Sequence, residues 1–66
     1  MLNLRIARLK AGLSQREVAE RLNVNINTVS RWENGTQKIQ IDSLVMLADL
    51  YNSSVDYLLG RKGYEN

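Results

Sequence analysis

The chain has 66 residues, with nine Lys or Arg, seven Asp or Glu, and no Cys, His, Pro or Phe. Domains span about 50 to 250 residues, so a chain of this length forms one domain at most. Without Cys and His it offers no disulfide framework, no zinc-finger ligand set and no imidazole base. We therefore expect a binding module and not an enzyme, with no cofactor and no metal.

The charges are unevenly divided along the chain. Residues 1–41 carry seven basic and three acidic side chains, whereas residues 42–66 carry two basic and four acidic ones. This asymmetry indicates that the N-terminal part faces a polyanion. No apolar run approaches the roughly 18 residues of a membrane span, and none near the N-terminus suits a signal peptide. We expect a cytoplasmic protein that has no membrane partner.

The first expected helix begins at Leu4 and ends at Gly12. Apolar and basic residues alternate irregularly along it, in the order Leu4, Arg5, Ala7, Arg8, Leu9, Lys10 and Ala11. This pattern is typical of a basic amphipathic helix, and glycine is the residue that most often ends a helix.

The second expected helix, residues 15–22, has the clearest start signal in the chain. Ser14-Gln15-Arg16-Glu17 is a capping box. In such a box the serine side chain accepts a hydrogen bond from the backbone three residues on, and the glutamate accepts one from the serine backbone. The residues expected to point inward are Val18, Ala19 and Leu22.

A tight turn leads to a third expected helix, residues 26–33. Asn23 belongs to a residue type that adopts the left-handed backbone conformation more readily than most, and Asn25 can cap the new helix. Val29 and Trp32 fall on one side of this helix, where Trp32 is expected in the core. The opposite side carries Asn27, Ser30 and Arg31.

Two more helices are expected in the acidic half of the chain. One covers residues 41–51, where apolar residues recur at helical spacing, and its cap is either Gln40 or Asp42. Ser54 caps the last helix, residues 55–59, which ends at Gly60. The sequence predicts one all-α domain of five helices over residues 4–60, followed by a C-terminal tail, residues 61–66.

The two short helices and the tight turn within residues 14–33 form a helix-turn-helix. In this motif the second helix enters the DNA major groove, which is about 12 Å wide. Asn27 and Arg31 lie four residues apart, on one side of that helix. Asn and Arg are the side chains that read adenine and guanine bidentately. The sequence therefore predicts specific binding to double-stranded DNA.

Four stretches of the chain match the pattern of one known family: Gly12-Leu13-Ser14-Gln15, Val18-Ala19, residues 28–35 (TVSRWENG) and residues 55–60 (VDYLLG). They resemble the Cro/repressor-type (XRE-like) helix-turn-helix family over roughly residues 4–60. The resemblance implies a compact, phage-repressor-like DNA-binding domain of five helices. It also implies a transcriptional regulator, most simply a repressor, that binds a near-palindromic operator as a homodimer. Cro-like members are complete at about this size, which favours that type.

The resemblance further implies which side chains contact DNA and a partner. The base-reading positions fall on Asn25, Ile26, Asn27, Ser30 and Arg31. The phosphate-contacting positions fall on Ser14, Gln15, Asn34, Thr36 and Lys38. Dimer contacts would come from helix five and its flanks, at Tyr57, Leu58 and Arg61.

Arg8 and Glu33 are expected to form a structural ion pair. Glu33 lies near the C-terminal end of the third helix, where a negative charge is unfavourable beside the helix dipole, so a cation should compensate it. The family pattern is similar in pairing an arginine of the first helix with this glutamate.

A second interpretation of the same fold stays open. The domain could be a protein-interaction module, such as an antitoxin or anti-regulator, with Met46, Leu50 and Tyr57 on its contact surface. Fold alone does not decide between these functions. A protein that contacts several phosphates must bind DNA with a steep salt dependence, and a pure interaction protein need not. The sequence identifies neither the operator nor any small-molecule effector.

Overall fold

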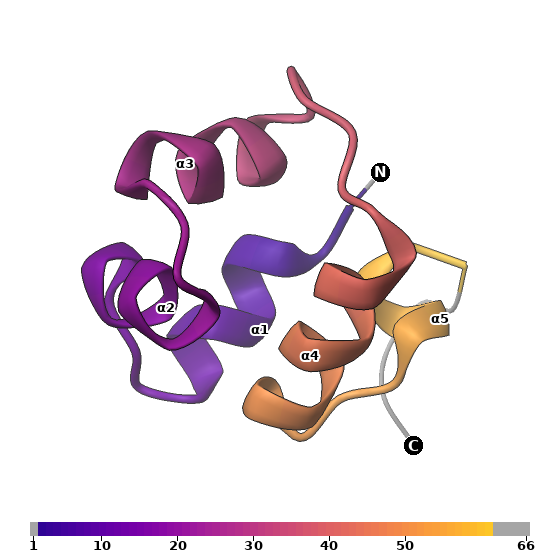
Figure 1. Ribbon diagram of the computed structural model, residues 1–66. Coiled ribbons are helices and arrows are strands. Elements are labelled where there is room, and N and C mark those ends of the chain that lie inside the picture. The colour runs from indigo at the N-terminus through magenta and orange to yellow at the C-terminus, as the bar shows by residue number, and fades with distance from the viewer. Residues whose placement is uncertain (1, 62–66) are drawn as a thin grey trace.

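The computed structural model describes residues 2–61, which form five α-helices and no strand (Figure 1). The helices are α1 (Leu4–Lys10), α2 (Gln15–Leu22), α3 (Ile26–Asn34), α4 (Ile41–Tyr51) and α5 (Val55–Leu58). The prediction of an all-α, five-helix fold is confirmed. Of the predicted tail, residues 62–66 lie outside the described part of the chain.

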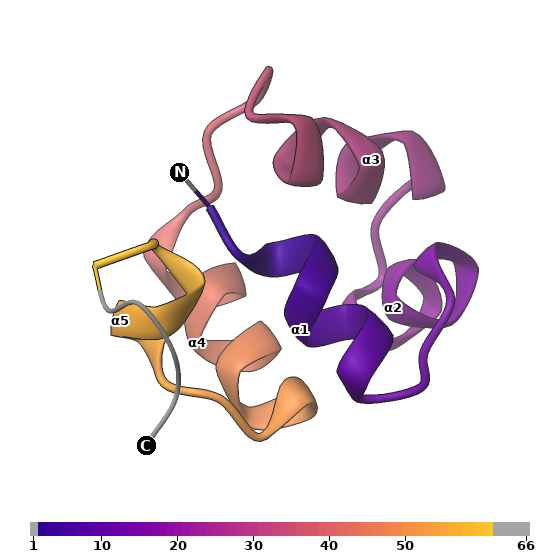
Figure 2. The same cartoon turned by 180° about the vertical axis from the view of Figure 1, so that it is seen from behind.

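The helices are arranged in two packed pairs with α1 between them. α2 packs on α3, α4 packs on α5, and α1 contacts both α3 and α4. In Figure 1, α3 crosses one end of the domain, and in Figure 2, seen from behind, α1 lies toward the viewer at the centre of the molecule. This arrangement leaves the outer side of α3 without a covering helix.

One apolar core joins all five helices. The buried members are Leu4, Ala7, Val18, Ala19, Val29, Trp32, Leu44, Leu47, Ala48, Tyr51, Tyr57 and Leu58. The expected core position of Trp32 is confirmed. Because each fully buried large apolar side chain contributes about 1.5–3 kcal/mol, this core is what holds such short helices together.

The predicted helix starts are largely those observed. The capping box of α2 is complete, with Glu17 N donating to Ser14 Oγ at 3.0 Å and Ser14 N donating to Glu17 Oε1 at 2.8 Å. Asn25 Oδ1 accepts from Asn27 N at 2.7 Å, and Ser54 Oγ accepts from Tyr57 N. At α4 the N-cap residue is Gln40, which decides between the two candidates.

All five helices end with the same backbone conformation and hydrogen-bond pattern. Each is followed by a residue with φ between 54° and 77°, at Gly12, Asn23, Gly35, Asn52 and Gly60. The amide of the next residue then donates to a carbonyl five residues back, as Val24 N does to Ala19 O at 2.9 Å. This is a Schellman-type end, and it makes each connection short. The left-handed Asn23 fixes the turn of the helix-turn-helix, as predicted.

Three positions differ from the simple amphipathic pattern. On α1 the charged Arg8 is buried, whereas Leu9 is 58% exposed, because Leu4, Ala7 and Arg8 together form the side of the helix that faces the core. On α4 the first apolar residue, Ile41, is 64% exposed. It stands at the start of the helix, to one side of the buried positions Leu44, Leu47 and Ala48.

The start of the chain is tied to its far end. Asn3 Nδ2 donates to Tyr57 O at 2.8 Å, and Asn3 N donates to Leu58 O at 3.0 Å. Lys10 Nζ lies 5.9 Å from the centre of the Tyr57 ring, within cation–π range. These contacts hold α1 against α5.

Over residues 2–61, no helix is long and apolar enough to cross a membrane.

Candidate nucleic-acid interface

α3 presents a polar face to solvent and an apolar one to the core. Val29 and Trp32 are buried, while Asn27 and Arg31 are exposed on the other side. Of the remaining predicted base-reading positions, Asn25 and Ile26 are exposed at the start of the helix, and Ser30 is half-buried. The five positions therefore lie along one accessible edge of α3.

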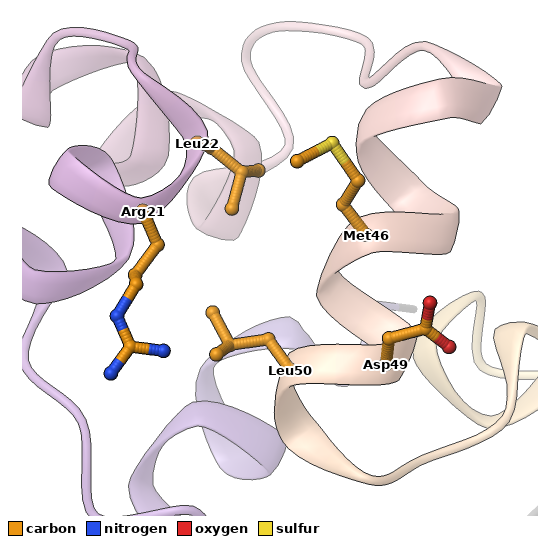
Figure 3. Close-up of a pocket in the computed structure, with 5 residues that line it drawn as sticks. All are labelled: Arg21, Leu22, Met46, Asp49 and Leu50. Carbon is orange, nitrogen blue, oxygen red and sulfur yellow. The ribbon is translucent and has the colours of Figure 1, made fainter.

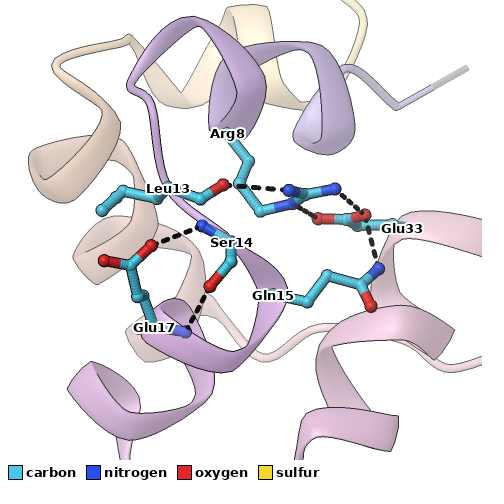
Figure 4. A network of polar contacts seen from close by, with 6 residues as sticks. All are labelled: Arg8, Leu13, Ser14, Gln15, Glu17 and Glu33. Atoms are coloured by element: carbon cyan, nitrogen blue, oxygen red, sulfur yellow. Dashed lines mark hydrogen bonds and ion pairs between the residues drawn. The ribbon is translucent and has the colours of Figure 1, made fainter.

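A polar network at the end of α3 binds it to the rest of the domain (Figure 4). The structure brings together the two side chains predicted to pair, with Arg8 Nε donating to Glu33 Oε2 at 2.6 Å and Arg8 Nη2 donating to Glu33 Oε1 at 3.2 Å. Arg8 Nη1 also donates to Leu13 O at 2.9 Å. The side chains of Arg8 and Glu33 are only 9% and 4% exposed, so this two-pronged pair is buried.

Gln15 joins the same network from the start of α2. Its Nε2 donates to Glu33 Oε1 at 3.0 Å, which leaves the second N–H of that amide for another acceptor. The side chain is half-buried and comes directly after the capping residue Ser14, which is exposed. Glu33 thus holds both the end of α3 and the predicted phosphate-contacting glutamine in fixed positions.

The other predicted phosphate-contacting residues follow the end of α3. Asn34, Thr36 and Lys38 are all exposed, and the backbone N–H of Thr36 donates to Arg31 O at 3.0 Å. Their loop projects from the end of the domain that α3 crosses (Figure 1). Because Gln15 bonds to Glu33, the predicted phosphate contacts of α2 and those of the loop after α3 both lie near the C-terminal end of α3.

The ionisable groups around the network respond to burial and to hydrogen bonds. The Glu33 carboxylate raises the pKa of Arg8 by accepting its hydrogen bonds. The Ser14 backbone and side chain lower the pKa of Glu17 through the capping box. Burial, with the nearby Glu33 charge, raises the pKa of Tyr51 to about 12. Arg8 therefore stays charged, and Tyr51 stays neutral, throughout the physiological range.

The residues predicted for dimer contacts do not form one exposed surface. Leu58 is fully buried and Tyr57 is 5% exposed, because both side chains belong to the core beneath α5. Arg61 is exposed and lies near Asp56, with Nη1 and Oδ1 3.7 Å apart. Tyr57 and Leu58 are thus core residues of the single chain, and dimer contacts at helix five and its flanks stay a prediction.

Two contacts of this region have no signal in the sequence. The bond from Gln15 to Glu33 spans 18 residues, and the bond from Arg8 to the Leu13 carbonyl depends on how α1 leads into α2. Every buried side-chain nitrogen or oxygen within residues 2–61 has a hydrogen-bond partner. No group of three or more potential metal-ligating side chains gathers in that range.

The amino-acid sequence was compared with protein families and with known proteins. The sequence profile of the helix-turn-helix family matches residues 4–58. The HTH-type transcriptional regulator ImmR of Bacillus subtilis (strain 168) is 47% identical over 58 residues, which are 88% of this chain and 46% of that protein. The uncharacterized HTH-type transcriptional regulator YobD of the same strain is 37% identical over 57 residues, which are 86% of this chain and 51% of that protein. The chain spans about half the length of these relatives, and it belongs to the Cro/repressor-type (XRE-like) helix-turn-helix family.

Proposed function

We propose that the chain binds double-stranded DNA in a sequence-specific manner and regulates transcription, with α3 as its recognition helix. The observation that carries this proposal is the exposed polar edge of α3, where Asn27 and Arg31 stand on a helix anchored by Val29, Trp32 and Glu33. The relatives ImmR and YobD, which are named as transcriptional regulators, support it.

The residues along α3 suit the chemistry of the major groove. Its nine residues span about 13 Å along the helix axis. The diameter of an α-helix with its side chains, about 10–12 Å, fits the groove width of about 12 Å. We expect Arg31 to donate to guanine and Asn27 to pair with adenine, as these side chains do most often. Ile26, which is 37% exposed, offers an apolar surface to a thymine methyl group.

Phosphate contacts at both ends of the motif would set the register on the duplex. Gln15 and Ser14 lie at the N-terminus of α2, where unpaired amides and the helix dipole attract an anion. Asn34 is the last residue of α3, and Thr36 and Lys38 lie just beyond it. Glu33 of α3 accepts hydrogen bonds from Gln15 and from Arg8. Because Gln15 is thus tied to α3, a phosphate contact made by Gln15 would also fix the position of α3 on the DNA.

The finer proposal is a repressor that acts as a homodimer in the cytoplasm. Two copies related by a two-fold axis would place their α3 helices in successive major grooves about 34 Å apart, on a near-palindromic operator. A dimer bound in this way covers one side of a promoter. The resemblance of the chain to the Cro/repressor type supports this arrangement.

A titration of labelled duplexes tests the proposal. With selected DNA, Arg31→Ala should cost about 1–3 kcal/mol of binding free energy and relax the preference at one base pair. Lys38→Ala should weaken all sequences alike and lower the salt slope by about one. Arg21→Ala is the matched control, since Arg21 is exposed at the far end of α2. Equal losses on selected and random DNA for Arg31→Ala would overturn its assignment to a base.

The alternative, a protein-interaction module, is favoured by one observation. Met46 and Val45 of α4 are 49% and 45% exposed, although Tyr57, once expected on the same surface, is buried. If the affinity for DNA stays flat as salt is raised, the phosphate contacts are absent and this alternative holds.

A further inference from the structure

A chemically labile pair of residues stands at the end of α3. Asn34 is the last residue of the helix, Gly35 follows it, and nowhere else in the sequence does a glycine follow an asparagine. An asparagine in this position loses its side-chain amide most readily, because glycine has no side chain to hinder attack by its own backbone nitrogen. The pair is therefore a candidate site of covalent modification.

The modification needs only water and a solvent base. The backbone nitrogen of Gly35 gives up its proton and forms a bond to Cγ of Asn34, and ammonia leaves that carbon with a proton from water. Water then opens the resulting cyclic imide at one of its two carbonyls. The product is aspartate, or isoaspartate when the main chain runs through Cγ. Neither step oxidises or reduces any atom.

Solvent reaches both residues of the pair. Asn34 and Gly35 are exposed. A carbon atom added at the Cβ position of Gly35 would meet no other atom within 4 Å, its chain neighbours aside. Water and base therefore have free access to the nitrogen and to the carbon that it attacks.

The folded backbone slows the reaction at this position. Gly35 N donates to Trp32 O at 3.2 Å, and Thr36 N donates to Arg31 O at 3.0 Å. The nitrogen of Gly35 can reach Cγ of Asn34 only when its own bond opens and Asn34 leaves the helical conformation. Because helix ends fray far more easily than a whole domain unfolds, opening of this last turn is the route that the fold leaves.

The product adds a negative charge among the predicted phosphate contacts. Asn34 follows Glu33, whose carboxylate already takes up the charge of Arg8 and a hydrogen bond from Gln15. A second carboxylate at the end of α3 is unfavourable beside the helix dipole. It would also repel the phosphate that Asn34 is predicted to contact.

We propose that Asn34 is a deamidation site, which reacts through opening of the last turn of α3, and that loss of its amide permanently lowers the affinity for DNA. The second part rests on the proposed function, whereas the first does not. Each copy of the chain would then carry a chemical clock on its recognition helix.

Mass spectrometry of peptides from the purified chain, aged at mildly alkaline pH, tests the chemistry without DNA. We expect Asn34 to be converted to aspartate and isoaspartate at a rate about ten- to a hundredfold below that in urea. Asn27 is the internal control: it is exposed on the same helix, but threonine follows it, and it should stay intact. No conversion of Asn34 in the folded chain over about a hundred half-lives of the reaction in urea would overturn the proposal.

A destabilised variant separates opening of the last turn from unfolding of the whole domain. A groove between α2 and α4 is lined by Arg21, Leu22, Met46, Asp49 and Leu50. None of these residues belongs to α3, and Figure 3 shows the half-buried Leu50 reaching into the space between the two helices. Leu50→Ala should raise the unfolded fraction about tenfold, through lost apolar burial, and leave the rate at Asn34 unchanged. A rate that rises about tenfold with it would mean that Asn34 reacts only in the unfolded chain, contrary to the proposal.

Titration of a selected duplex tests the effect on DNA binding. Asn34→Asp should bind at least about fivefold more weakly than Asn34→Ala, which lacks the amide but adds no charge. Asn52→Asp is the matched control, since it makes the same charge change on an exposed residue after α4 and should bind like the wild type. Equal affinities of Asn34→Asp and Asn34→Ala would refute the effect on binding. A wild type that binds no duplex would refute the proposed function, while the mass measurement still decides the modification.

Discussion

Replacing Arg8 with alanine removes one half of a buried ion pair and leaves the other half without its charge partner. The guanidinium makes two hydrogen bonds to Glu33 and one to the Leu13 carbonyl, and the Glu33 side chain is 4% exposed. Removing one member of such a pair costs about 3–5 kcal/mol. The total stability expected for a chain of this length is about 3–10 kcal/mol, so Arg8→Ala should bring the domain close to unfolding.

Urea unfolding, followed by circular dichroism and by the fluorescence of the buried Trp32, measures this loss. In thermal unfolding the same loss of about 3–5 kcal/mol should lower the melting temperature by about 12 °C or more. In a domain of this size, 1 kcal/mol corresponds to about 4–8 °C. The double variant Arg8→Met with Glu33→Leu should recover much of the stability, because an apolar pair leaves no buried charge unpaired. Arg5→Ala is the control: that side chain is exposed on the same helix and should matter by less than about 0.5 kcal/mol.

An exposed pair would instead give a cost of less than about 1 kcal/mol for Arg8→Ala, and this loss would shrink further as salt is added. That result would mean that water reaches the pair and screens it, contrary to the burial of both side chains.

Three further predictions concern the helix ends and the buried tyrosine. Asn23→Ala should cost about 1 kcal/mol in urea unfolding, because alanine tolerates the left-handed conformation poorly, whereas Asn23→Gly should be nearly neutral. Ser14→Ala should cost about 1 kcal/mol through loss of the α2 cap; a value near zero would mean that the cap is dispensable. Because the pKa of Tyr51 is raised to about 12, its contribution to stability is complete below the ordinary value of 10 and is lost as the pH rises from 10 to 12. Tyr51→Phe should flatten this decline in alkaline urea titrations, and an unchanged decline would contradict the assignment.

The positions of the helices could be predicted from the sequence because their ends are encoded locally. The Ser14–Glu17 capping box, the cap at Asn25 and the left-handed residue at Asn23 each act over a few residues, and the observed α2 has the predicted bounds. The observed α4 also has the predicted bounds, whereas α3 ends one residue later and α5 one residue earlier than predicted, and α1 ends at Lys10 and not at Gly12.

The contacts that hold the interface together could be predicted only in part. The pairing of Arg8 with Glu33 follows from the helix dipole and the family pattern, but the bond from Gln15 to Glu33 depends on the angle between α2 and α3. Likewise, the bonds from Asn3 to the backbone of Tyr57 and Leu58 join segments about 54 residues apart. Helical spacing alone predicts that the apolar Leu9 is buried and the charged Arg8 exposed, whereas the structure has the reverse. The ion pair of Arg8 with Glu33 decides which side of α1 faces inward.

The proposed function predicts a specific double-stranded DNA sequence, and selection from a random duplex library on the purified chain, at about 0.1 M salt, tests this most directly. We expect enrichment of a near-palindrome whose half-sites are about one helical turn apart, with the preference at one base pair lost in Arg31→Ala. A folded protein that enriches no sequence from the library would contradict the assignment of α3 as a recognition helix.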